Sequence, residues 1–183
     1  MYLEFNENGV LEPKDYQLTI EQLKHSLLVQ GPAYDQPWNK EWRKLLVSNL
    51  EIMVNQLHQV GIEEIFIDGS FVEDKASPSD IDGYFVVDPF DLERITEALN
   101  SLEPDQIWTW SERIPDHNSS KLQLPMWHKY HIELYPHVGQ GCGILDEYGY
   151  EQMFPAAFRK TRDTFLPKGI IQIVKEVDYH DQK

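Results

Sequence analysis

The chain has 183 residues, of which 41% are hydrophobic and 26% are charged, so its composition favours a folded domain over disorder. The formal net charge is −15, from 16 basic and 31 acidic residues. A surface of that sign repels a polyphosphate backbone, which disfavours a broad nucleic-acid-binding face. It is compatible with a small nucleotide that is held through divalent cations.

The sequence carries no signal for a membrane or for export. No apolar run approaches the roughly 20 residues of a membrane helix. Residues 1–7 have neither the basic region nor the apolar core of a signal peptide. Cys142 is the only cysteine, which excludes an intramolecular disulfide and a cysteine zinc cluster. We therefore expect a cytoplasmic protein.

The first 30 residues predict an arm and a helix. Residues 1–18 place turn formers between apolar residues, and we expect them to lie as an extended arm over the core. Thr19 and Gln22 have the spacing of a capping box, which opens a helix. This helix is expected to run to about residue 30, because Gly31 and Pro32 then interrupt it.

Apolar residues recur at three- and four-residue spacing from 39 to 60, which predicts a long amphipathic helix ending at Gly61. Beyond it, short runs of β-branched and aromatic residues alternate with helical patterns. Strands are expected over 62–67, 81–87, 107–110, 130–135 and 169–174, helices over 91–102 and part of 146–166, and a loop over 111–121. This order predicts a single α/β (α+β) domain over residues 1–183.

Two carboxylates, Asp80 and Asp82, stand two residues apart at the start of the 81–87 strand. Side chains with that spacing leave the same face of a sheet. Carboxylates that close repel each other unless something positive lies between them. Mg²⁺ prefers such ligands, and pairs of divalent ions promote in-line phosphoryl transfer. A pair of solvent-exposed acids at a strand start explains the same two residues, and both interpretations stay open.

Gly69 and Ser70 follow the buried 62–67 strand directly. Because glycine has no Cβ, the backbone there can approach a bound anion, and free N–H groups can hold phosphate oxygens. Alone, the pair is typical of an ordinary turn. In series with Asp80-Ile81-Asp82 it is much more specific. Lys75, in the intervening loop, is a candidate phosphate contact or simply a solvated lysine.

This combination resembles the nucleotidyltransferase (polymerase-β-like) superfamily. Its signature is a strand ending in Gly-Ser or Gly-Gly, a spacer, and Asp-x-Asp or Asp-x-Glu at the head of the next strand. The wider run over 68–82, together with 5–11 and 167–171, is similar to a group of small uncharacterised bacterial and phage nucleotidyltransferase-like proteins. The resemblance implies the mixed sheet of the nucleotidyltransferase fold, flanked by helices.

The superfamily places a third carboxylate on a later strand, beside the first two. Glu133 is the best match in this chain, with Ile132 and Leu134 pointing to the opposite side of the strand. Aspartate is the commoner residue there, so glutamate is a departure that changes the geometry. The alternative is an acid that faces the surface.

The resemblance implies a metal-dependent enzyme. Asp80, Asp82 and Glu133 would bind Mg²⁺ or Mn²⁺ and carry the catalysis, while Gly69, Ser70 and Lys75 would bind the nucleotide. The donor would be a nucleoside triphosphate such as ATP, whose nucleoside monophosphate passes to an acceptor as pyrophosphate leaves. The acceptor is unidentified: an RNA end, a protein or a small molecule would each serve. A homodimer or a partner chain would supply the surface that holds it.

Two other interpretations remain. The first keeps the fold without the catalysis, as a nucleotide- or protein-binding module of a toxin–antitoxin or phage-defence system, and Glu133 and the acidity favour it. The second is a metal-dependent nuclease. Its restriction-type arrangement needs a lysine two residues after the strand glutamate, where Tyr135 stands, so this interpretation is weak.

Other polar and aromatic residues give weaker signals. The main concentration of basic residues either contacts the triphosphate or an acceptor, or balances surface acids: Arg159, Lys160, Arg162 and Lys168. Three tryptophans are candidates for stacking on a base, although packing is their usual role: Trp108, Trp110 and Trp127. His128, His131 and His137 have irregular spacing and no supporting cysteine, which favours core or surface histidines over a zinc site.

Overall fold

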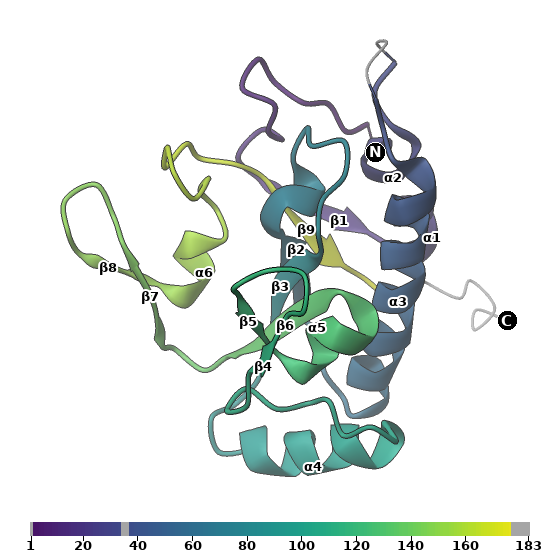
Figure 1. The fold of residues 1–183 in the computed structure, drawn as a ribbon, viewed down its shortest axis with the longest axis vertical. Coiled ribbons are helices and arrows are strands. Elements are labelled where there is room, and N and C mark those ends of the chain that lie inside the picture. Colours follow the sequence, from purple (N-terminus) through teal and green to yellow (C-terminus); the bar gives the residue numbers. More distant parts are fainter. Residues whose placement is uncertain (1, 34–36, 177–183) are drawn as a thin grey trace, which may run out of the picture.

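The computed structural model describes residues 2–33 and 37–176, and its centre is a five-stranded mixed sheet (Figure 1). The strand order is β1-β9-β2-β3-β6. β1 runs parallel to β9 and β3 runs parallel to β6, whereas β2 is antiparallel to both of its neighbours. The strands are β1 (Asp15–Leu18), β2 (Ile65–Asp68), β3 (Ile81–Val86), β6 (Ile132–His137) and β9 (Ile170–Ile173). The predicted α/β class with a mixed sheet is confirmed.

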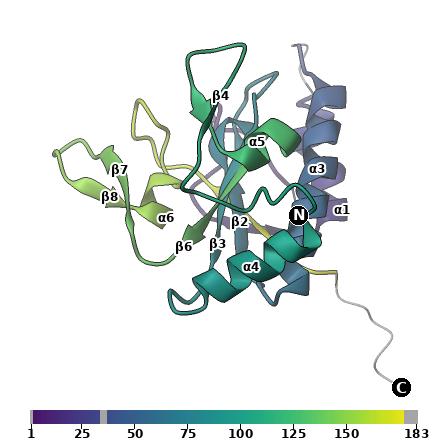
Figure 2. The ribbon, with the colours of Figure 1, turned by 60° about the horizontal axis from the view of Figure 1, so that its bottom comes forward.

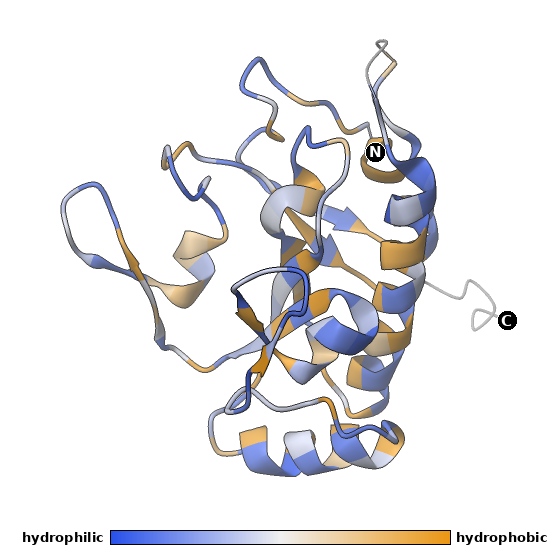
Figure 3. Ribbon diagram, viewed as in Figure 1, coloured by the Kyte–Doolittle hydropathy of each residue, from blue (hydrophilic) through white to orange (hydrophobic). Residues whose placement is uncertain are grey.

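The long helix α3 (Lys40–Gln59) covers one face of this sheet (Figures 1 and 2). It begins at Asn39, whose side chain accepts a hydrogen bond from the Trp42 N–H at 3.2 Å. Its apolar face packs with Ile65, Phe85 and other strand residues in one core that extends from Leu3 to Ile173. Hydrophobic and hydrophilic segments alternate along the helix accordingly (Figure 3). The predicted amphipathic helix is confirmed.

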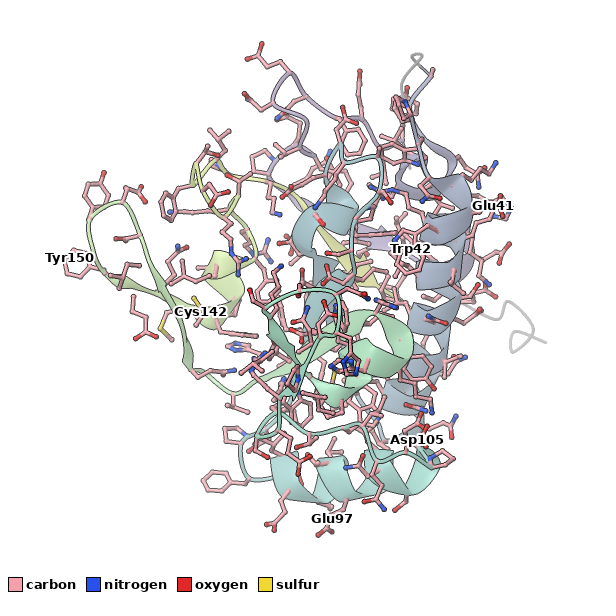
Figure 4. All side chains as sticks on the ribbon, in the orientation of Figure 1. Glu41, Trp42, Glu97, Asp105, Cys142 and Tyr150 are labelled. Atoms are coloured by element: carbon pink, nitrogen blue, oxygen red, sulfur yellow. The ribbon has the colours of Figure 1, made fainter. Side chains whose placement is uncertain are left out.

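The opposite face of the sheet has a smaller aromatic cluster. The rings of Phe66 and Tyr84, on β2 and β3, stack with 4.8 Å between their centroids, and Phe154 packs against Tyr84. Phe154 begins the short helix α6 (Phe154–Ala157), which follows a hairpin formed by β7 (Gly141–Leu145) and β8 (Glu151–Met153). This hairpin projects away from the sheet, with Cys142 and Tyr150 on it (Figure 4).

The remaining elements lie around the edge of the sheet. α4 (Leu92–Leu102), predicted over 91–102, lies across one end (Figure 2). β4 (Ile114–Pro115) and β5 (Leu122–Gln123) form a two-stranded ribbon before α5 (Pro125–Tyr130). Among the described residues, no helix is long and apolar enough to cross a membrane.

The N-terminal segment differs in two ways from the expected arm and helix. Its last residues, 15–18, are not an arm but the edge strand β1, because they pair in register with β9. The capping box of Thr19 and Gln22 is present. The helix it opens nevertheless ends early, as α1 (Ile20–Lys24), and α2 (Leu27–Gln30) follows. Between them the Ser26 hydroxyl donates to the Leu23 carbonyl at 2.8 Å, where the helix would otherwise continue.

Two strand predictions in the C-terminal half are wrong. Residues 107–110 form no strand, because the Trp108 N–H donates to the side chain of Asn100 at 3.0 Å instead of to a neighbouring strand. The strand expected from 130 begins at Ile132, after helix α5 and the left-handed backbone of His131. The helix expected in part of 146–166 is present at residues 154–157, and 151–153 form a strand.

The close packing of β3 against β2 predicts that Gly83→Ala destabilises the fold. A Cβ at residue 83 would lie 2.2 Å from the carbonyl oxygen of Phe66 and 3.2 Å from the Cα of Ile67. Because both atoms belong to the backbone, relief requires the strands to separate, at a cost of about 1–3 kcal/mol. Urea denaturation followed by circular dichroism would measure this loss. A free energy of unfolding within about 0.5 kcal/mol of the wild type would contradict the packing.

Candidate active site

Three carboxylates lie side by side on three neighbouring strands. In the antiparallel pairing of β2 with β3, Asp68 is opposite Asp82, and in the parallel pairing of β3 with β6, Asp82 is opposite Glu133. Residues opposite each other in a sheet project from the same face, with Cβ atoms about 5 Å apart in an antiparallel pair. The register therefore brings Asp82 between two further acids, on the face opposite α3. The sequence predicted Glu133 in this position but not Asp68.

Asp80 precedes β3 and is fixed by neighbouring elements. Its Oδ2 accepts a hydrogen bond from the indole N–H of Trp127 in α5 at 2.9 Å, and its Oδ1 accepts one from the Ser79 hydroxyl at 3.0 Å. Pro78, two residues before Asp80, is bonded to α3, because its carbonyl accepts a hydrogen bond from the indole N–H of Trp42 at 2.6 Å. Two tryptophans thus set the position of the first carboxylate of the Asp-x-Asp motif.

Gly69 lies directly against Asp82. A Cβ placed on Gly69 would be 2.4 Å from Oδ2 of Asp82, and the backbone of Gly69 has a φ of +71°, so an L side chain here is both strained and obstructed. Gly69 and Ser70 begin the 3₁₀ turn η1 (Gly69–Val72). The structure therefore brings the glycine-serine pair and the Asp-x-Asp motif together. Lys75 is exposed farther along the loop.

Both carboxylate oxygens of Glu133 have hydrogen-bond donors within the protein. Oε1 accepts from the Leu124 N–H at 2.9 Å and Oε2 accepts from the Tyr135 hydroxyl at 2.5 Å, while a nitrogen of Arg113 lies 4.0 Å from Oε1. Glu133 is adjacent to Asp82 but oriented by these partners. In the described part of the chain, no three His, Cys, Asp or Glu side chains are arranged to hold a metal ion.

Lys168 is a site residue whose role could not be recognised in the sequence. It is 4% exposed, and its ammonium lies 3.3 Å from Oδ1 of Asp68, 2.5 Å from Oε1 of Glu73 and 3.4 Å from the carbonyl oxygen of Gly69. Asp68 is 2% exposed, and its Oδ1 makes no hydrogen bond despite the nearby ammonium. The proximity of Asp68 to Gly69 in the sequence was a usable signal, whereas Lys168 is 99 residues from Gly69.

The family described as a family of unknown function (DUF6932) matches residues 3–174. The chain belongs to this family. The matched region contains every site residue described above. The comparisons with curated proteins and with solved structures gave no significant match.

Burial and neighbouring charges raise the pKa values of Asp82 and Asp68 in this DUF6932 protein. Burial is the largest cause that raises the pKa of Asp82, to about 8, and the charges of Asp80, Glu133 and Asp68 add to it, while Arg162 opposes it. Burial also raises the pKa of Asp68 to about 7, against the lowering effect of Lys168. Near neutral pH the cluster therefore needs a proton or a cation to compensate its charge.

Arg43 of α3 holds the loop that carries the glycine-serine pair. Its guanidinium is fully buried and donates to the carbonyl oxygens of Phe71 at 2.8 Å, Glu73 at 3.3 Å and Lys75 at 2.6 Å, and to that of Leu28 at 2.7 Å. Burial lowers its pKa to about 10. Three of the four acceptors belong to the segment that follows Gly69, so Arg43 fixes that segment from the side of α3.

Replacing Asp82 by asparagine is expected to change how the stability of the DUF6932 protein depends on pH. The pKa of Asp82 is about 8 in the folded state and about 3.9 in an unfolded chain, so the folded state binds this proton more tightly. Its contribution to stability therefore falls as pH rises from about 4 to 8 and is constant above that. In Asp82→Asn this fall disappears.

The measurement is the free energy of unfolding in urea between pH 5 and 9, with EDTA present. Each kcal/mol of repulsion removed at pH 8 raises Tm by about 2–4 °C for a chain of this size. Asp163→Asn, at an exposed position, is the control and leaves the pH slope unchanged. Equal slopes for Asp82→Asn and the wild type would contradict the raised pKa of Asp82.

Arg43→Met is expected to destabilise the protein by about 3 kcal/mol or more, because carbonyl oxygens that lose a buried donor stay desolvated. The loop after Gly69 should also become a preferred site of limited proteolysis. Urea denaturation and protease digestion measure the two effects. Arg94→Met, on the exposed side of α4, is the matched control and should cost less than about 0.5 kcal/mol. An Arg43→Met variant as stable and as resistant as the control would refute this role.

Proposed function

We propose that this protein is a metal-dependent nucleotidyltransferase, which moves a nucleoside monophosphate from a nucleoside triphosphate to an acceptor. The observation that carries the proposal is the contact between the glycine-serine turn and Asp82. The carboxylate of Asp82 occupies the space that a side chain on Gly69 would need. Asp80 stands at the head of β3, the strand that carries Asp82. Phosphate-binding backbone and paired carboxylates at one place are the two requirements of this chemistry.

The residues fit a divalent cation with oxygen ligands. Asp80 and Asp82 would hold Mg²⁺ or Mn²⁺, and the raised pKa of Asp82 supports a need for positive charge beside it. When bound, the cation would neutralise the triphosphate and polarise its α-phosphate. Glu133 adds negative charge next to Asp82, in an orientation set by Leu124 and Tyr135.

The chain's own groups bind and align the reactants. The backbone at Gly69 and Ser70 would bind the phosphates next to the carboxylate of Asp82, and Arg43 fixes the loop that follows. Trp127 keeps Asp80 at the head of β3. In the reaction the acceptor oxygen bonds to the α-phosphorus as the bond to pyrophosphate breaks, and the acceptor's proton leaves to solvent. Lys75 would reach the outer phosphates from the exposed loop.

A binding module without catalysis is the second candidate, and the state of Glu133 favours it. Glu133 has a positive neighbour in Arg113, whereas the donors to Asp80 are neutral, so less of the charge of Glu133 is left for a metal ion. Such a module would bind a nucleotide or a protein in a toxin–antitoxin or phage-defence system. In either role we infer a cytoplasmic protein, for which a second copy or a partner chain would complete the acceptor surface.

Turnover of nucleoside triphosphates separates the two candidates. The enzyme should release pyrophosphate from ATP or another triphosphate with Mg²⁺ or Mn²⁺, and Asp82→Asn should lower the rate by about 100-fold or more, because it removes a charge that acts on the transition state. Asp163→Asn should retain the wild-type rate. All four nucleotides are tested with pooled RNA, protein and small-molecule acceptors.

Nucleotide binding by calorimetry is measured alongside. Binding without pyrophosphate release, unchanged by Asp82→Asn, would reject the transferase and support the binding module. Pyrophosphate release that persists in Asp82→Asn would reject the assignment of the site, because that activity would come from elsewhere.

A further inference from the structure

The acids of the site differ in whether the protein itself supplies them with a cation. Asp68, on one side of Asp82, lies 3.3 Å from the ammonium of Lys168. Glu133, on the other side, has a guanidinium nitrogen of Arg113 at 4.0 Å. The outer two acids of the row are thus each accompanied by a positive side chain.

The inner pair has no such partner among the residues that the structure describes. No ammonium or guanidinium nitrogen in residues 2–33 and 37–176 lies within 4.0 Å of a carboxylate oxygen of Asp80 or Asp82. Asp80 has neutral donors only, from Trp127 and Ser79. An ion-paired cation is therefore absent where the two motif carboxylates meet, where the charge of Arg162 acts on Asp82 only from beyond 4.0 Å, and present on the Asp68 side.

Lys168 is fixed in this position by the backbone around it. Its own N–H donates to the Arg159 carbonyl at 2.9 Å, and the next residue, Gly169, donates to the Leu11 carbonyl at 2.9 Å. A Cβ on Gly169 would lie 2.5 Å from the carbonyl oxygen of Glu12, so the segment is pressed against the chain there. The ammonium is buried and contacts Asp68, Glu73 and Gly69 together.

A buried ammonium is costly to desolvate, and it repels a second cation placed beside it. Oδ1 of Asp68, which is buried and makes no hydrogen bond, lies 3.3 Å from that ammonium. We propose that Lys168 is a positioning residue that takes the place of a second metal ion, so that the site binds a single divalent cation, at Asp80 and Asp82. This inference rests on the metal dependence in the proposed function and specifies its stoichiometry.

The number of bound ions is measured directly with Mn²⁺ alone, by electron paramagnetic resonance of free Mn²⁺ during a titration of the intact protein. One ion per chain is expected, with affinity lowered about 10-fold or more in Asp82→Asn, because a ligand charge is lost. Two ions whose affinities lie within about 10-fold of each other would overturn the proposal, and so would no binding at all.

Substitution of Lys168 tests whether its ammonium is what prevents a second ion from binding. In Lys168→Met, a second Mn²⁺ is expected to bind within about 10-fold of the affinity of the first, since Asp68 and Glu73 lose their cation. Lys168→Arg keeps the charge and should bind one ion. A Lys168→Met protein that folds, by circular dichroism, and still binds one ion would overturn the role of Lys168. If this variant does not fold, Lys168→Gln is used, and the wild-type stoichiometry still decides.

The outcomes separate this inference from the proposed function. One bound Mn²⁺ without any turnover of nucleoside triphosphates leaves the single-ion site in place and rejects the transferase. Two bound ions with turnover reject the single-ion site and leave the transferase in place. The titration contains no nucleotide, so its result does not depend on finding the acceptor.

Discussion

Repulsion between carboxylates that the sheet forces together is the constraint on which the rest of this site depends. Asp68, Asp82 and Glu133 are opposite one another because β2, β3 and β6 pair in one register, and that register is also the one that buries the alternate residues against α3. A shift by one residue would move every side chain to the other face. The hydrophobic core therefore holds the acids close together although they repel one another.

Several features relieve this repulsion, each in a different way. Lys168 brings an ammonium to Asp68, the Leu124 N–H and the Tyr135 hydroxyl bind Glu133, and Trp127 donates to Asp80. Asp82 has no ion-pair partner within the described residues, and burial followed by the charges of the neighbouring acids raises its pKa to about 8. Sites that retain uncompensated charge are common where a ligand supplies the missing charge, which is why the central pair is the proposed position of the cation.

The parts of the fold that could be predicted from the sequence are those set by local patterns. The spacing of apolar residues predicted α3, and the capping box of Thr19 and Gln22 depends on contacts over three residues. The meeting of Gly69 with Asp82 also followed, because a short connection between antiparallel neighbours returns the chain to the same edge of the sheet. The strand expected over 107–110 failed because Trp108 bonds to Asn100, eight residues away, and to Gln56, 52 residues away, rather than to a strand.

The site also contains residues that no local sequence pattern could identify. Lys168 was one of several basic residues near the end of the sequence, and only the pairing of β9 with β2 brings it to Asp68. Arg43 stands in a helix whose other charged residues are more accessible, so its burial against loop carbonyls had no local signal.

The most direct measurement of the central claim is anomalous X-ray scattering from a crystal of the protein soaked in Mn²⁺. If Asp80 and Asp82 bind a divalent cation next to the glycine-serine turn, an anomalous peak will contact both carboxylates and lie beside Gly69. A crystal saturated with Mn²⁺ that shows no peak between these two residues would contradict it.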